Sequence, residues 1–168
     1  MEERIVTIRQ TAVGRIGISA KDGALVGLSF LQGEALCEDG ASVEPLLDEA
    51  FSQLTAWLEG RLTTFSLPLA PTGTPFMHRV WTALLDIPYG STSSYRDIAV
   101  AVGSPGGARA VGMACGRNPL PIFIPCHRVT GSGGRPGGYL GGIDLKYSLV
   151  ELERSTARAM TSILYSYD

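Results

Sequence analysis

A segment rich in proline and glycine, Pro71-Thr72-Gly73-Thr74-Pro75, interrupts the chain before its midpoint and strongly constrains the fold. Prolines at both ends fix φ and remove backbone donors, so neither a helix nor a central strand can run through the segment. We therefore place a domain boundary here, with one domain over residues 1–72 and a second over residues 73–168. At 168 residues and 45% hydrophobic side chains, the chain can bury a substantial core.

The two halves differ in charge. Residues 1–72 hold five Arg and Lys against ten Asp and Glu, a net charge of −5, whereas residues 73–168 hold nine against six, a net charge of +3. From Arg96 to Lys146 there are six basic residues and two acidic ones. This pattern favours a local face that binds DNA phosphates, although an ordinary solvated surface would look similar.

The first half has the pattern of a small antiparallel sheet followed by a helix. Residues 4–9 alternate as a strand, and residues 14–19 and 24–30 flank Ala20-Lys21-Asp22-Gly23, whose Asp-Gly pair is typical of a hairpin turn. A helix is predicted to begin at Pro45, because four apolar residues follow at helical spacing. They are Leu47, Phe51, Leu54 and Leu58.

The three cysteines, Cys37, Cys115 and Cys126, form neither a disulfide framework nor a CxxC zinc motif. We expect a reduced compartment and no metal site, with Cys37 an exposed thiol in the acidic, irregular stretch 33–43 and Cys115 buried. No stretch approaches the ~18 apolar residues of a membrane span, and residues 1–4 lack the basic start of a signal peptide. We therefore expect a cytoplasmic protein that does not associate with membranes.

Short helices are predicted after the linker. A helix over residues 76–85 is followed by Ser94-Tyr95-Arg96-Asp97, which resembles a capping box and begins a second helix. Gly103 ends the second helix. Ser104 is then predicted to cap, and Pro105 to begin, a third helix that is rich in small residues.

Together the second and third helices predict a helix-turn-helix over about residues 94–116, whose second helix would meet the DNA duplex. Ala108, Ala110 and Gly112 are small enough to allow close approach to a groove without reading base edges. An ordinary helical hairpin would produce the same pattern.

The tetrapeptide Pro125-Cys126-His127-Arg128 places a thiol beside an imidazole. Cysteine attacks as thiolate, and at a free pKa of about 8.5 it needs a nearby base or cation near neutral pH. Neighbours on an extended chain point to opposite faces, so a Cys126–His127 contact requires a turn or a bridging water. For the dipeptide alone, a buried structural cysteine is the alternative.

Five motifs stand in the order and spacing of one family. They are Arg109-Ala110-Val111-Gly112, Asn118-Pro119, Ile124-Pro125-Cys126-His127-Arg128-Val129, Gly138-Tyr139 with Gly141-Gly142, and Lys146 to Glu153. From Phe76 to Glu153 the chain resembles the O6-alkylguanine-DNA alkyltransferases, which repair DNA. The resemblance implies an α/β (α+β) fold with a small ribonuclease-H-like N-terminal domain. A mainly helical C-terminal domain would carry the helix-turn-helix and an active-site loop over residues 118–142.

The resemblance also implies a reaction. The protein would flip O6-alkylguanine, and O4-alkylthymine, out of duplex DNA and transfer the alkyl group irreversibly to Cys126. His127 would deprotonate Cys126 through a bound water, while Glu153 would hold the imidazole. The thioether product cannot be hydrolysed, so each molecule would act once. No cofactor is implied. We expect a monomer in solution, and the sequence leaves open whether several molecules bind DNA cooperatively.

Further roles follow from the same resemblance. Tyr95 would donate a hydrogen bond to guanine N3, Asn118 would brace the turn before the active site, and Arg109 would replace the flipped nucleotide. A core tyrosine and a phosphate-binding arginine are the alternatives for Tyr95 and Arg109. The implied DNA-binding residues are Arg109, Ala108, Ala110, Gly112, Tyr95 and Arg128. Arg128 would also organise the site by pairing with an acidic side chain. The implied pocket residues are Val129, Tyr139, Leu140 and Gly138, where Leu140 departs from the smaller residues common in the family.

Three other functions remain open on the sequence alone. A damage sensor of the alkyltransferase-like class would bind lesions without transfer, but that class lacks the acceptor cysteine. A Cys-His-Glu hydrolase would turn over and would not need Arg109. A DNA-binding regulator would keep Cys126 as a buried structural residue.

Overall fold

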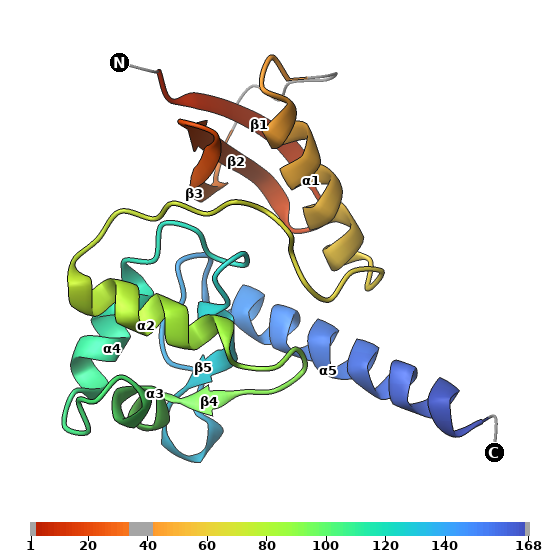
Figure 1. Cartoon of the computed structure of the whole chain (residues 1–168). Helices are drawn as coiled ribbons and strands as arrows, with labels where there is room; N and C mark the ends of the chain where they lie inside the picture. Colours follow the sequence, from red (N-terminus) through yellow and green to blue (C-terminus); the bar gives the residue numbers. More distant parts are fainter. Residues whose placement is uncertain (1–2, 34–41, 167–168) are drawn as a thin grey trace. The chain divides into compact units, whose positions relative to one another are not determined.

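A computed structural model of the chain describes residues 3–33 and 42–166. These residues form two compact units (Figure 1). One unit contains the described residues up to Gly73 together with Pro119–Phe123, and the other contains Thr74–Asn118 and the described residues from Ile124 onward. Cys37 and most of the predicted irregular stretch 33–43 lie outside the described residues.

The first unit is built on a three-stranded antiparallel sheet in the order β1-β2-β3. Its strands are β1 (Ile5–Thr11), β2 (Gly14–Lys21) and β3 (Ala24–Leu31). Asp22 and Gly23 join β2 to β3 with φ values of 52° and 76°, the positive φ pair that a tight hairpin turn requires. The predicted hairpin is therefore confirmed.

Helix α1 (Pro45–Leu58) supplies most of the remaining core of this unit. Glu44 caps it by accepting a hydrogen bond from the Leu46 backbone N–H. Leu47, Phe51 and Leu54 are buried as the helical spacing predicts. In the last turn of α1 the buried residue is Trp57, whereas the spacing predicts Leu58.

The segment Pro119–Phe123 also belongs to the first unit. The Leu28 backbone N–H donates to the Pro119 carbonyl at 2.8 Å. The ring of Phe123 packs edge-on against Phe65, with 4.9 Å between the ring centroids. The chain therefore contributes this segment to the first unit immediately before it reaches the predicted active-site tetrapeptide.

The second unit is mainly helical. Its helices are α2 (Pro75–Leu85), α3 (Tyr95–Ala101), α4 (Ala108–Gly116) and α5 (Ile143–Tyr165). The predicted capping box is confirmed: Ser94 accepts from the Asp97 backbone and Asp97 accepts from the Ser94 backbone. Trp81 on α2 donates its indole N–H to the Ala114 carbonyl of α4 at 2.9 Å, which fixes α2 against α4.

Helix α4 begins later than the sequence predicts. Ser104 and Pro105 were expected to cap and begin it, but the helix begins at Ala108 after the N-cap residue Gly107. The Gly107 backbone N–H instead donates to the Ser104 carbonyl at 2.8 Å and closes a turn. Two consecutive glycines, Gly106 and Gly107, favour this turn because glycine is a poor helix former.

Two very short strands, β4 (Ser93–Ser94) and β5 (Val129–Thr130), pair in parallel. Ser93 pairs with Val129 and Ser94 with Thr130. Because α3 begins directly after β4, this pairing brings Tyr95 close to the residues that follow Cys126. No helix among the described residues is long and apolar enough to cross a membrane.

Candidate active site

Cys126 lies in a tight turn and not in a strand. Pro125 precedes a single 3-10 turn, η1 (Cys126–Arg128), which the Arg128 backbone N–H closes by donating to the Pro125 carbonyl at 3.0 Å. The bend expected from Pro125 is thus present, and it removes the opposite-face geometry of an extended Cys-His pair. The Cys126 side chain and its two neighbours are buried.

His127 and Glu153 form a buried hydrogen-bonded pair. His127 Nε2 lies 2.9 Å from Glu153 Oε1, and both residues are at most 1% exposed. Glu153 reaches this position from the middle of α5. With the Nε2 hydrogen donated to the carboxylate, Nδ1 carries the lone pair that can accept a proton.

Arg128 holds the same carboxylate from a second side. Its Nε lies 2.9 Å from both Glu153 oxygens, and its Nη2 lies 2.6 Å from Oε1. Its Nη1 donates to the Ile87 carbonyl at 2.8 Å, and the Gly90 backbone N–H donates to Glu153 Oε2 at 3.3 Å. The carboxylate is therefore fixed by an imidazole, a guanidinium and a backbone amide.

These contacts set the protonation states of the pair. Burial alone would raise the pKa of Glu153, but the hydrogen bonds from His127 and Arg128 outweigh it and lower that pKa. Burial lowers the pKa of His127 despite the opposing effect of Glu153. The histidine is therefore neutral at rest, as a general base must be.

Burial raises the pKa of the Cys126 thiol to about 11. A hydrogen bond from the Asn118 side chain and the charge of Lys146 act in the opposite direction and favour the thiolate. The Asn118 amide also donates to the Ile124 carbonyl at 2.9 Å. Asn118 thus braces the turn before Cys126 and contacts the thiol itself.

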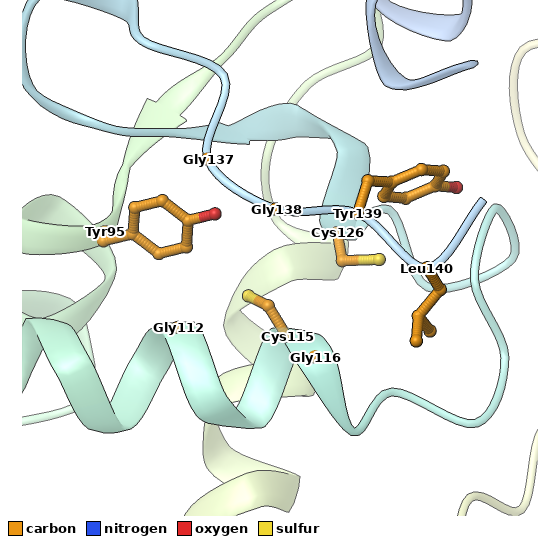
Figure 2. Close-up of a pocket in the computed structure, with 9 residues that line it drawn as sticks. All are labelled: Tyr95, Gly112, Cys115, Gly116, Cys126, Gly137, Gly138, Tyr139 and Leu140. Carbon is orange, nitrogen blue, oxygen red and sulfur yellow. The ribbon is translucent and has the colours of Figure 1, made fainter. Parts of the chain in front are cut away.

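Cys126 opens onto a cavity of about 480 Å³. Figure 2 shows α4 below this cavity, Tyr95 at one side, and the strand-like loop through Gly137 to Leu140 above it. A ligand of the size of an alkylated purine base fits a cavity of this volume. The lining residues are Tyr95, Gly112, Cys115, Gly116, Cys126, Gly137, Gly138, Tyr139 and Leu140.

The glycine at position 137 is required by Tyr95. Gly137 has φ of 65°, and a Cβ added there would overlap the Tyr95 hydroxyl. The loop can therefore pass close to Tyr95 only where no side chain is present. Burial raises the pKa of Tyr95 to about 12, so its hydroxyl stays a hydrogen-bond donor.

Lys146 is a site residue to which the sequence assigned no individual role. It is 1% exposed, and its Nζ lies 3.5 Å from the Tyr95 hydroxyl and 3.4 Å from the Gly138 carbonyl. Burial lowers its pKa, while charge on Cys126 or Cys115 raises it. The only sequence signal was its place in the last of the five motifs, because periodicity does not show which lysine is buried.

Two assignments from the sequence fit the structure less well. The expectation that Arg128 contacts DNA conflicts with its burial and with its bonds to Glu153 and Ile87. Its other implied role, pairing with an acidic side chain, agrees with the bonds to Glu153. Val129 is fully buried in β5 and is not among the residues that line the cavity, so its side chain does not form the pocket wall. The burial of Arg128 and the burial of Val129 both follow from the η1 turn, which directs the residues after Cys126 into the core.

The small-residue helix α4 presents a different surface. Arg109 and Ala110 are exposed, and Ala108 and Gly112 are partly exposed. Gly112 and Gly116 face the cavity, whereas Arg109, Ala108 and Ala110 do not line it. Helix α4 thus links an exposed arginine at its first turn to the floor of the cavity near its end. Leu140, by contrast, lines the cavity while remaining 52% exposed.

Among the described residues, no three His, Cys, Asp or Glu side chains lie together in a group that could hold a metal ion. The two buried cysteines are both free thiols.

The arrangement defines a class of protein: a helix-turn-helix joined to a buried cysteine-histidine-glutamate site. Residues 75–155 match the DNA-binding domain of 6-O-methylguanine DNA methyltransferase, and residues 5–71 match the ribonuclease-like domain of the same protein. A methylated-DNA–protein-cysteine methyltransferase of Methanosarcina barkeri is 44% identical over 154 residues, covering 90% of this chain and 98% of that protein.

A second relative and a solved structure match the chain in the same way. The constitutive methylated-DNA–protein-cysteine methyltransferase of Bacillus subtilis is 44% identical over 156 residues, covering 88% of this chain and 94% of that protein. The structure of Mycobacterium tuberculosis OGT in complex with DNA matches with a TM-score of 0.80 at 41% identity, covering 90% of this chain and 93% of that one. The chain belongs to the 6-O-methylguanine DNA methyltransferase family.

Proposed function

We propose that Cys126 is the alkyl acceptor of this protein, a methylated-DNA–protein-cysteine methyltransferase that repairs O6-alkylguanine in duplex DNA. The observation that carries the assignment is the His127–Glu153 pair, with 2.9 Å between Nε2 and Oε1, directly beside a thiol that lines a base-sized cavity. O4-alkylthymine is proposed as a second substrate. A cytoplasmic location is part of the same proposal.

Transfer needs a thiolate, and four groups favour it. His127 accepts the thiol proton through a bound water, and Glu153 stabilises the imidazolium that forms. The Asn118 side chain and the charge of Lys146 both lower the pKa of Cys126 against the effect of burial. Attack at the alkyl carbon then forms a carbon–sulfur bond while the carbon–O6 bond breaks.

The leaving guanine gains negative charge as that bond breaks. Tyr95 lines the cavity, and its hydroxyl stays protonated because burial raises its pKa to about 12. A donor to guanine N3 stabilises the leaving group. Lys146 Nζ lies 3.5 Å from the same hydroxyl.

Helix α4 would deliver the base. Arg109 is exposed in its first turn and would fill the gap left by the flipped nucleotide, while the small residues of α4 allow close approach to the minor groove.

Arg128 is assigned here as a positioning residue that holds the Glu153 carboxylate. The boundary between residues 72 and 73, as a limit between separately folding domains, remains a prediction.

Intact-mass measurement tests the acceptor. The protein is incubated with a duplex that contains one O6-methylguanine, and with the unmodified duplex as control. We expect a gain of one CH₂, located on Cys126, that saturates at one equivalent and is absent from the Cys126→Ser variant.

Two outcomes would contradict the proposal. Lesion binding without a mass gain would indicate a damage sensor, and repeated turnover without a mass gain would indicate a hydrolase. The Cys115→Ser variant is the matched control, because it removes the second buried thiol of the same cavity.

A further inference from the structure

Two free thiols face the cavity that holds the acceptor. Cys115 on α4 and Cys126 in η1 both line it. Figure 2 shows their sulfur atoms pointing in different directions, so a bond between them requires rotation of at least one of the two side chains. Cys115 is 8% exposed and Cys126 is 4% exposed, and both line the cavity. The proposed alkyl transfer uses Cys126 and assigns no role to Cys115.

Asn118 ties the backbones of the two cysteines together. Its backbone N–H donates to the Cys115 carbonyl at 3.2 Å, and its side-chain amide donates to the Ile124 carbonyl at 2.9 Å. The same Ile124 carbonyl accepts from the Cys126 backbone N–H at 2.8 Å. Three hydrogen bonds therefore link the end of α4 to the start of η1 through Asn118 and Ile124.

The thiols also influence each other electrostatically. Burial raises the pKa of Cys115 to about 12, and negative charge on Cys126 raises it further. Cys126 has the adjacent base His127 and a hydrogen bond from Asn118. Of the two thiols, Cys126 is therefore the one that ionises and reacts first.

We propose that Cys115 is a resolving thiol, which forms a reversible disulfide with Cys126 after a peroxide has oxidised Cys126. The proposal rests on the assignment of Cys126 as the acceptor. The disulfide occupies the acceptor sulfur, so it stops alkyl transfer until a thiol reductant restores both cysteines.

The chemistry balances with hydrogen peroxide as the oxidant. The Cys126 thiolate attacks one peroxide oxygen, so a sulfur–oxygen bond forms, the oxygen–oxygen bond breaks, and the leaving hydroxide takes the proton held by His127 to become water. The Cys115 sulfur then attacks the Cys126 sulfur and displaces the hydroxyl, which leaves as a second water with the Cys115 proton. Two thiols and one peroxide give one disulfide and two waters.

Such a bridge suits a protein that acts only once. Oxidation of Cys126 beyond the sulfenic acid is irreversible in the absence of a dedicated rescue enzyme, and it would destroy the acceptor before any lesion is met. A resolving thiol in the same cavity captures the sulfenic acid while the damage can still be reversed.

Peptide mapping provides the direct test. The reduced protein is treated with one equivalent of hydrogen peroxide and digested with trypsin without reductant. Cleavage after Arg109, Arg117 and Arg128 places the two thiols on separate peptides, residues 110–117 and 118–128. We expect these peptides to be joined, lighter than their sum by two hydrogen atoms, and separated by dithiothreitol.

Alkyl-transfer activity provides the second readout. It is measured before treatment and again after oxidation followed by reduction, and the second value is divided by the first. We expect this ratio to be close to one for the unaltered protein and for the Cys37→Ser control, and several-fold lower for Cys115→Ser. In the Cys115→Ser variant, Cys126 should carry two or three added oxygens.

Unlinked peptides with equal over-oxidation of Cys126 in the unaltered protein and in Cys115→Ser would overturn the proposal. A link from Cys37 to Cys126 in place of the predicted one would also overturn it. Failure of the acceptor assignment is seen separately, because the reduced and untreated protein would then gain no CH₂ from the methylated duplex.

Discussion

The two compact units bury different kinds of side chain. Among the described residues, the polar residues buried in the first unit are Thr7 and Ser19, neither of which is charged. The second unit buries an amide, an imidazole and three charged groups. They are Asn118, His127, Arg128, Lys146 and Glu153.

This difference distinguishes a unit whose buried residues serve stability from a unit whose buried residues serve a reactive site. Burying charge is costly unless it is paired, and an apolar replacement of similar size is often more stable. The first unit is held by an ordinary apolar core, whereas the second retains buried charges that surround one thiol. Buried titratable groups of this kind mark reactive sites more often than structural ones.

The chain offers a separate probe for each unit. Trp57 is buried in the first unit and Trp81 in the second, and these are the two tryptophans of the sequence. Replacing one of them by phenylalanine leaves fluorescence that reports unfolding of a single unit. The predictions below use these single-tryptophan proteins and run from the largest expected change in stability to the smallest.

Replacing the buried acid should have the largest effect. In Glu153→Gln, Arg128 stays buried without its counter-charge, and loss of one partner of a buried pair costs about 4 kcal/mol. We expect the Trp81 signal to report this loss in urea unfolding, together with slower alkyl transfer. Glu151→Gln on the exposed face of α5 is the matched control, and an equal loss in both variants would contradict the prediction.

Truncation of the apolar core should affect the other unit. Leu54 is fully buried on α1, and Leu54→Ala should lower the stability of the first unit by about 3 kcal/mol through lost burial and a cavity. We expect the Trp57 signal to shift while the transfer rate of the folded protein is unchanged. Val43→Ala, at an 88% exposed position, serves as the control, and a large fall in transfer rate for Leu54→Ala would break the comparison.

Acid should weaken the second unit first. Burial, together with the charges of Arg128 and Lys146, lowers the pKa of His127 against the effect of Glu153. Below the ordinary histidine pKa of about 6.5 the unfolded chain binds a proton that the folded chain does not, so stability falls as pH falls, by at most about 1.4 kcal/mol per pH unit.

The pKa of Glu153 is lowered as well, so its contribution is present above the ordinary glutamate pKa and is lost at still lower pH. Urea unfolding followed by Trp81 between pH 7 and 5 measures the effect of the histidine. The slope should disappear in His127→Gln and persist in His78→Gln, which removes the other histidine. A slope that persists in His127→Gln would assign the effect to another group.

Removing the exposed arginine of α4 should leave stability within experimental error but reduce function. In Arg109→Ala we expect slower transfer and a smaller signal from 2-aminopurine placed beside the lesion, which reports base extrusion. Arg96→Ala removes the same charge from the exposed first turn of α3. Equal losses in the two variants would make Arg109 a phosphate contact and not the residue that fills the gap.

Much of the fold was predictable because its signals are local. The Asp22-Gly23 turn, the capping box at Ser94 and the apolar face of α1 each depend on residues within a few positions of one another. The start of α4 was predicted wrongly because Ser104 and Pro105 match a helix start, while Gly106 and Gly107 favour a turn. The sequence contained both signals and did not rank them.

The candidate site was partly predictable, for a different reason. Cys126 and His127 are adjacent in the chain, and Glu153 was assigned through the family motif. Neither periodicity nor spacing could show that Lys146 would be buried beside Tyr95. The pairing of Arg128 with an acidic side chain followed from the family resemblance alone, because the direction of this side chain depends on the η1 turn.

The sequence by itself determined the chemical groups: a thiol with an adjacent imidazole, a run of small residues in a short helix, and a difference in net charge between the two halves of the chain. The tertiary structure decided which of these groups meet. Residues 95, 115, 126, 139 and 146 line or border one cavity because β4 pairs with β5 and α5 returns across the η1 turn. Such encounters depend on packing between distant segments, which local propensity does not encode.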